Sequence, residues 1–127
     1  MARTRIEIQR DINAKKQEIR NCEQERSKYQ TALKYANKLV EQLNESYKKL
    51  TTANDYMKKY FTINKKIADG GEISKAQEGI NSQLKKVKQT IIPEINKEIT
   101  KRDSTLRNLR TQLNRYENEL RFSVIMI

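Results

Sequence analysis

The side chains that could do chemistry in this chain are carboxylates, amines and one thiol, because the sequence contains no histidine and a single cysteine. On a helix, Glu41 and Glu45 would lie on one face, as the two carboxylates of a general acid–base pair would. Glu94 and Glu98 repeat this spacing. Charged residues make up 34% of the chain, however, so such pairs arise by chance on solvated helix surfaces. Because the sequence also lacks a glycine-rich phosphate loop, we predict that the chain is not an enzyme and binds no cofactor or metal.

Basic residues dominate the charge of the chain. Lys and Arg number 27 against 16 Asp and Glu, which gives a net charge of +11. Between Arg26 and Lys66, ten basic residues accompany three acidic ones, and lysine pairs at 48–49, 58–59 and 65–66 are interleaved with aromatic residues. Such a stretch could bind nucleic-acid phosphates, remain a solvated face or dock an acidic protein. No signature of a nucleic-acid-binding fold accompanies it, so nucleic-acid binding is an alternative and not the main prediction.

Apolar residues recur along the first half of the chain with the alternating steps of four and three that are typical of a coiled coil. The positions of this seam are Ile8, Ile12, Lys15, Ile19, Cys22, Arg26, Tyr29, Leu33, Ala36, Val40, Leu43, Tyr47, Leu50, Asn54, Met57 and Phe61. Thirteen of these sixteen residues are apolar or aromatic and no proline interrupts them, which predicts one long helix. Cys22 lies on the seam, so we predict a buried small side chain; a redox or disulfide role is the alternative.

The double glycine in the stretch IADGGEISKA, residues 67–76, predicts the end of this helix. Glycine readily adopts the left-handed conformation that closes the last turn of a helix. We therefore predict a turn at Asp69, Gly70 and Gly71. Either Asp69 supports the turn or Ser74 caps the helix that follows.

Helical apolar spacing resumes after the glycines, from Ile73 to Leu120. The sequence therefore predicts an all-α fold, a long antiparallel helical hairpin. The predicted parts of this single domain, residues 1–127, are a helix over 4–67, a turn over 68–72, a helix over 73–122 and an apolar C-terminal end over 122–127.

Folding the chain back at the double glycine predicts a register in which facing residues have numbers that sum to about 141. Met57 would then lie near Leu84, and Tyr29 near Leu113. The residues predicted to form the hairpin core are Leu33, Val40, Leu43, Leu50, Met57, Ile80, Leu84, Ile91, Ile99 and Leu109.

The second helix contains an irregular stretch. Between Val87 and Ile99 the apolar residues take three steps of four in a row, which departs from the heptad. Pro93 lies inside this stretch and lacks the backbone N–H that a helix interior requires. We predict a kink or short break at residues 90–93; the alternative is that Pro93 opens a third helix.

Several apolar residues, Tyr35 and Leu39 among them, lie off the seam, and the chain ends in RFSVIMI. A hairpin has only one seam, so these residues widen the apolar surface to what three or four packed helices would bury. The candidates for a protein interface are Tyr56, Tyr60, Phe61, Ile63, Ile67, Ile92, Phe122, Val124, Ile125 and Ile127. We predict association with helices of another protein or with a second copy. The C-terminal cluster could instead cover Ile8 and Ile12 of its own chain.

The stretch YFTINKKIADGGEISKAQEGINSQLKKVKQTIIPEINKEI, residues 60–99, combines an aromatic residue, a polar linker with Asp-Gly, an amphipathic helix and Ile-Ile-Pro-x-Ile. It resembles small helical-hairpin accessory proteins of LXG toxins in Gram-positive type VII secretion, related in shape to the WXG-type family. The resemblance implies binding to the helical N-terminal domain of a secreted toxin, with or without a second small helical accessory protein. The chain lacks the Trp-x-Gly turn, and Leu120 stands where a Tyr-x-x-x-Asp/Glu export signal after Tyr116 would need an acid.

The N-terminal residues lack the apolar core of a cleavable signal peptide, and no stretch approaches the ~20 apolar residues that span a bilayer. We expect a protein of the bacterial cytoplasm, retained there or exported together with its partner. The leading hypothesis is a non-enzymatic helical adaptor or targeting chaperone for an LXG-type toxin. A basic coiled-coil protein that binds nucleic acid and a structural homo-oligomeric rod are the alternatives.

Overall fold

The computed structural model describes residues 3–60 and 71–125, with side chains at 3–59 and 71–123. Its elements are α1 (Arg5–Tyr60), α3 (Glu72–Lys86), the π-helical turn η1 (Val87–Ile91) and α4 (Ile92–Ile125). These ranges contain no strand. The predicted all-α helical hairpin is confirmed.

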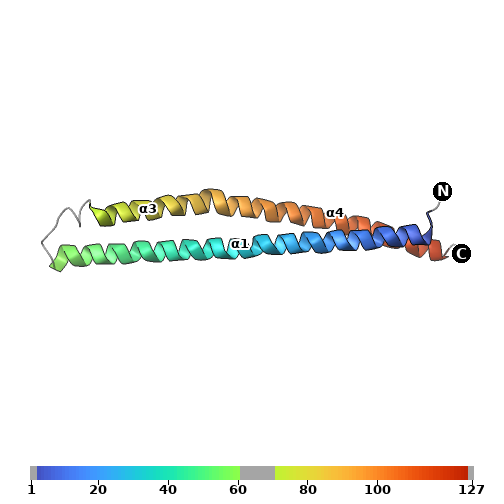
Figure 1. Ribbon diagram of the computed structural model, residues 1–127, viewed down its shortest axis with the longest axis horizontal. Helices are drawn as coiled ribbons and strands as arrows, with labels where there is room; N and C mark the ends of the chain where they lie inside the picture. The colour runs from blue at the N-terminus through green and yellow to red at the C-terminus, as the bar shows by residue number, and fades with distance from the viewer. Residues whose placement is uncertain (1–2, 61–70, 126–127) are drawn as a thin grey trace. The chain divides into compact units, whose positions relative to one another are not determined.

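The helices form two compact units, each of which is described by itself. The terminal unit comprises residues up to 31 together with residues from 96 onward, and the central unit comprises residues 32–95. In each unit a segment of α1 lies beside an antiparallel segment from the second half of the chain (Figure 1). Each unit is therefore held by one seam between two helices.

Helix α1 extends over 56 residues because nothing in its sequence opposes the helical conformation. It contains neither glycine nor proline. Thr4 caps its start, with Oγ1 accepting a hydrogen bond from the backbone N–H of Glu7 at 3.2 Å. Glu7 lies in the first turn and Lys58 and Lys59 in the last, so the charges at both ends complement the helix dipole.

The buried side of α1 follows the heptad spacing. Every seam position from Ile8 to Met57 is buried or half-buried. Among the other described positions of α1, only Asp11 is half-buried, and the rest are exposed. Because the inward residues recur every 3.5 residues on average, they form one narrow column along the helix. The polar seam residues Lys15, Arg26 and Asn54 occupy this column as well.

The core of the terminal unit is its best-sealed part. Ile8 and Ile12 are 1% and 3% exposed. Ile19 and Cys22 of α1 form a buried cluster with Leu106 of α4, against which Leu109 and Leu113 pack. Cys22 is thus a small buried side chain, and its Sγ approaches the backbone oxygen of Arg102 at 3.6 Å.

The predicted register is wrong in both units. In the terminal unit Arg26 pairs with Asp103, twelve positions before the residue that the predicted register would place there. In the central unit the amide of Gln77 donates to Thr51 Oγ1 at 2.8 Å, a displacement of thirteen positions. Both displacements are close to two heptads, and a slip of whole heptads still sets apolar residues against apolar residues. The apolar pattern therefore determined which residues face inward but not which partners they meet.

The single π-helical turn η1 restores the phase of the seam between α3 and α4. Before it, inward positions step by four and three from Ile73 to Val87, and after it the same steps resume at Ile92. The backbone N–H of Ile92 bonds the carbonyl of Val87, five residues back, so the turn holds one extra residue. Pro93 follows, and the wider turn suits a residue that has no N–H and whose ring would crowd the preceding turn.

This turn corrects two predictions for individual residues. Ile91, predicted in the hairpin core, is 45% exposed because the extra residue carries it off the seam. Ile92, predicted as an interface residue, is half-buried on the seam in its place. The irregularity predicted at residues 90–93 takes the form of a π turn over Val87–Ile91 and not of a break.

The other nine residues of the predicted core are buried or half-buried. Leu84 is the most enclosed of them, at 8% exposure. In the central unit it lies between Ile80 and Val87 on the inward side, and Ala36 of α1 is equally buried there.

Helix α3 begins at Glu72, after Gly71 as its N-cap residue. Gly71 has φ −94°, so no left-handed conformation occurs at this position. No side chain caps the helix, and the predicted Ser74 cap is wrong because Ser74 lies within the first turn. Asp69 and Gly70 lie outside the described residues.

Candidate protein-interaction surface

Six large apolar side chains within the described residues are exposed and lie outside the heptad seams. They are Ile6, Tyr35, Leu39, Tyr56, Ile91 and Phe122. Four of the six belong to the central unit. Exposed aromatic and aliphatic side chains that gather on one side of a helix are typical of surfaces that bind another protein.

Three of these side chains lie along one side of α1 in the central unit. Tyr35 and Tyr56 are three heptads apart, and Leu39 lies one turn after Tyr35. Ala32 and Ala53 fall on the same side and are exposed as well. We call these five residues the outer stripe; it runs beside the inward column of α1. Tyr35 is 66% and Tyr56 56% exposed, so the stripe presents aromatic surface to solvent.

In the terminal unit, the residues on either side of the seam are charged, and they form ion pairs within the unit. Arg102 of α4 donates from Nε to Glu25 at 3.2 Å and also pairs with Glu98. Its guanidinium lies over the ring of Tyr29, 4.9 Å from the centroid. Nearer the middle of α4, Arg110 pairs with Glu23 at 3.2 Å. These contacts cover the edges of the seam with cations and carboxylates from the two helices.

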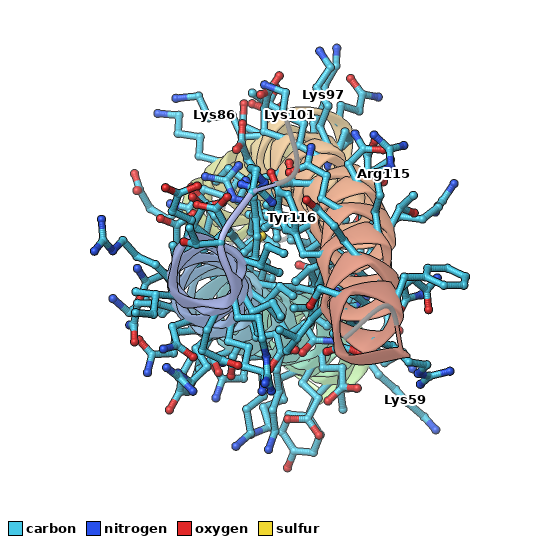
Figure 2. The ribbon with its side chains drawn as sticks, turned by 90° about the vertical axis from the view of Figure 1, so that its right-hand side faces the viewer. Lys59, Lys86, Lys97, Lys101, Arg115 and Tyr116 are labelled. Carbon is cyan, nitrogen blue, oxygen red and sulfur yellow. The ribbon has the colours of Figure 1, made fainter. Side chains whose placement is uncertain are left out.

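Arg3 closes the end of the terminal unit. It donates from Nε and Nη2 to the carboxylate of Glu119, at 3.0 and 2.8 Å, and pairs with Asp11 as well. Its guanidinium lies 5.1 Å from the ring centroid of Tyr116, whose side chain points inward from α4 (Figure 2). The hydrogen bonds from Arg3 hold the pKa of Glu119 below its usual range, although partial burial opposes the shift.

The groove beside Cys22 brings the one thiol of the chain close to carboxylates and a lysine. Its lining includes Glu18, Cys22, Glu25 and Lys101, and it is open to solvent along one side. Burial raises the pKa of the Cys22 thiol, and Glu25 adds to this, so the nucleophilic thiolate is disfavoured. Its carboxylates are engaged: Glu18 pairs with Lys15 and Glu25 with Arg102.

The carboxylates of Glu94 and Glu98 have different surroundings. Glu98 pairs with Lys101 and Arg102, whereas Glu94 is exposed. Burial would raise the pKa of Glu98, but the two cations outweigh it and the pKa lies below its usual range. A carboxylate held ionised in this way is a structural anion and not a general acid.

The inward side of the central unit contains a polar layer. Gln77 donates from Nε2 to Thr51 Oγ1 and to the backbone oxygen of Tyr47 at 3.4 Å. Asn54 lies one turn further along α1, and its buried Oδ1 has no hydrogen-bond partner among the described residues. An unsatisfied buried oxygen is unfavourable by about 1–3 kcal/mol, so this seam is less well satisfied than that of the terminal unit.

The predicted interface residues have different locations. Tyr56 and Phe122 are exposed, and Ile92 is half-buried. The remaining candidates, whose backbone or side chains lie outside the described residues, are Tyr60, Phe61, Ile63, Ile67, Val124, Ile125 and Ile127. Ile6 and Ile91 are exposed apolar residues that the sequence reasoning did not select. Ile91 could have been found by testing a one-residue phase shift before Pro93.

Among the described residues, no three His, Cys, Asp or Glu side chains gather where they could hold a metal ion. Nor is any helix in this part of the chain both long and apolar enough to cross a membrane. The chain matches no family model, no curated protein and no solved structure with which it was compared.

Proposed function

We propose that this chain is a non-enzymatic helical adaptor that binds helices of another protein through the outer stripe of the central unit. The observation that carries the proposal is that α1 uses one column of residues for its own hairpin and leaves Tyr35, Leu39 and Tyr56 exposed beside that column. A partner helix laid along the stripe would extend the seam on its open side, as a third helix does in a bundle.

The residue types of the outer stripe suit such a partner. Tyrosine provides a large apolar ring and a polar hydroxyl, and it is enriched at protein interfaces. Full burial of a side chain such as Leu39 contributes about 2 kcal/mol. The spacing of Tyr35, Leu39 and Tyr56 by whole heptads and single turns matches the period of a partner helix. Gln42, Ser46 and Lys49 lie between them on the same side and would face the polar positions of that helix.

A second copy of the chain is a poorer partner for this surface. Lys49 lies in the same heptad column as Tyr35 and Tyr56, and Lys38 is exposed next to Leu39, so two stripes packed together would bring lysines close to one another. Like charges at an interface oppose association, whereas a partner with fewer cations avoids this repulsion.

The resemblance of residues 60–99 to accessory proteins of LXG toxins supports a specific partner. We propose the helical N-terminal domain of an LXG-type toxin, which the chain would accompany to the type VII secretion machinery as a targeting chaperone. Phe122, exposed on α4, is a further candidate contact in the terminal unit.

The experiment that tests this function is co-expression with the helical N-terminal domain of an LXG-type toxin, followed by light scattering of the purified material. We expect a complex of defined mass. Leu39→Ser should weaken this complex at least tenfold, whereas the matched control Ile6→Ser, which removes an exposed isoleucine from the terminal unit, should leave it unchanged. A discrete homodimer that ignores the toxin domain would instead support a structural homo-oligomer.

A further inference from the structure

The outward side of α4 in the terminal unit is basic and contains no acid. Opposite the seam, between residues 97 and 122, five positions carry a cation and the others carry Ser, Thr, Asn or, at the end, Phe122. We call the five cations the basic face; they are Lys97, Lys101, Arg107, Arg115 and Arg121. All five are exposed, and Figure 2 shows Lys97, Lys101 and Arg115 pointing outward from the helix.

The acids of this part of α4 point elsewhere, toward the borders of the seam. Asp103 and Glu119 pair with Arg26 and Arg3 of the N-terminal segment. Glu98 pairs with Lys101 at 3.4 Å, and this is the one ion pair that reaches the basic face within the described residues. Glu117 is exposed, but it lies at the border of the seam and not on the basic face. Within the described residues, Lys101 is thus the one cation of the basic face that pairs with a carboxylate.

Other outward surfaces of the chain are mixed in charge. On α1 of the central unit, the outward positions carry lysines together with Glu41, Glu45 and Asp55. On α1 of the terminal unit they carry Glu7 in the first turn and, from Arg10 onward, three cations and no acid. The side of α4 therefore differs in its density of charge, with five cations and no acid.

The spacing of the basic face fits another helix. Lys101 and Arg115 are two heptads apart, as are Arg107 and Arg121, so the cations form straight columns with the period of a packed helix. Phe122 continues the column of Lys101 and Arg115 and is 62% exposed. The phosphates of a duplex backbone offer an apolar ring no apolar partner, whereas the apolar side of an amphipathic helix can bury it.

Resting on the proposed function, we infer that the basic face binds an acidic helical segment of the partner protein, with Phe122 as the apolar anchor. The partner helix carries Asp or Glu at heptad spacing and a small apolar patch that covers the ring. Arginine suits this contact because its guanidinium binds a carboxylate through two parallel hydrogen bonds. Exposed charges of this kind also accelerate encounter with an oppositely charged partner.

The test compares two triple variants with the same net charge. The face variant carries Lys101→Gln, Arg107→Gln and Arg115→Gln. The matched control carries three exposed lysines of the central unit changed in the same way: Lys34→Gln, Lys48→Gln and Lys85→Gln. Each is titrated with the toxin's helical N-terminal domain, with a synthetic helical peptide bearing Glu in two heptad-spaced columns, and with a 20-base-pair DNA duplex, over a range of salt concentrations.

We expect the face variant to lose about tenfold in affinity for both the toxin domain and the acidic peptide and to show a flatter salt dependence. The control variant should stay within twofold of the wild-type chain. Equal losses of affinity in the face variant and the control variant would overturn the inference. Tighter binding of the DNA duplex than of the peptide, with the duplex affinity reduced in the face variant, would also overturn it. A toxin domain that binds wild type and face variant alike overturns the inference but not the proposed function. If the chain binds the acidic peptide through the basic face but forms no complex with the toxin domain, the result supports the inference and overturns the proposed function.

Discussion

The terminal and central units are built on the same two-helix plan but differ in what borders their seams. In the terminal unit, Arg3, Arg102 and Arg110 link the helices to carboxylates, and the core contains isoleucines that are almost fully buried. In the central unit, hydrogen bonds from Gln77 to Thr51 and to the backbone of Tyr47 link the helices. The side of α1 next to its seam carries exposed Tyr35, Leu39 and Tyr56.

The difference indicates a division of tasks between stability and binding. A border satisfied by ion pairs and stacked guanidinium groups has little to gain from a further helix. A border of exposed aromatic and aliphatic residues gains apolar burial when a partner covers it. The seam of the central unit also contains the buried Asn54 oxygen, which has no hydrogen-bond partner in the described part of the chain and so weakens the seam.

The largest effect is expected from a charge in the seam of the central unit. Leu43→Asp would place a carboxylate at a half-buried inward position, which should lower the free energy of unfolding by about 3 kcal/mol or more. Gln42→Asp is the matched control, because Gln42 is exposed on the neighbouring position. Thermal melts followed by circular dichroism check both variants. Unchanged helicity and melting temperature in Leu43→Asp would show that α1 does not pack through this column.

A smaller effect on stability is expected from deleting single glutamines, and its size should differ between two sites. Deletion of Gln89 removes the extra residue of η1 and leaves Val87 and Ile92 a normal heptad step apart, so stability should change by less than about 1 kcal/mol. Deletion of Gln83, within α3, shifts Ile80 out of phase with Leu84 and should destabilise the unit by about 2 kcal/mol. Denaturant unfolding gives both values. Equal losses would mean that the π turn is not a phase correction.

The smallest expected effect is a pH dependence of stability that is present in the ion-paired terminal unit and weaker in the central unit. The pKa of Glu119 is lowered in the folded chain, so its contribution is present above the ordinary glutamate value of about 4.3 and disappears as pH falls through the folded value. Acid titration should therefore loosen the terminal unit in this window, and Glu119→Gln should remove part of that dependence. Hydrogen exchange measured peptide by peptide checks this; identical acid profiles for wild type and Glu119→Gln would contradict it.

The sequence predicted the fold class and the inward residues because a heptad period is a direct record of which side of a helix is buried. It did not predict the register, since a slip of two heptads preserves every apolar match. The cross-helix pairs of Arg26 and Arg102 follow from the register and could not be anticipated without it. At Pro93 the irregular spacing was visible, but assigning Ile91 to the core assumed three α-helical steps where the chain uses one π turn.

The candidate site was predictable in part for the same physical reason. Tyr35 and Leu39 stand off the seam in the sequence, so their exposure follows from the period alone. The acid-free side of α4 does not follow from the charge along the chain, which is most basic between Arg26 and Lys66, because it depends on how charges are distributed around the helix. The pairing of Asp103 and Glu119 with cations of the N-terminal segment shows that these two acids do not face the outward cations of α4.

The most direct test of the central claim is hydrogen exchange of the chain alone and in complex with the toxin's helical N-terminal domain, followed by mass spectrometry of peptides from each unit. The account predicts that binding slows exchange most strongly in α1 between residues 32 and 57, where the outer stripe lies, with a smaller change in α4 between 97 and 122. Protection confined to α1 before residue 31, or no change in either unit, would contradict it.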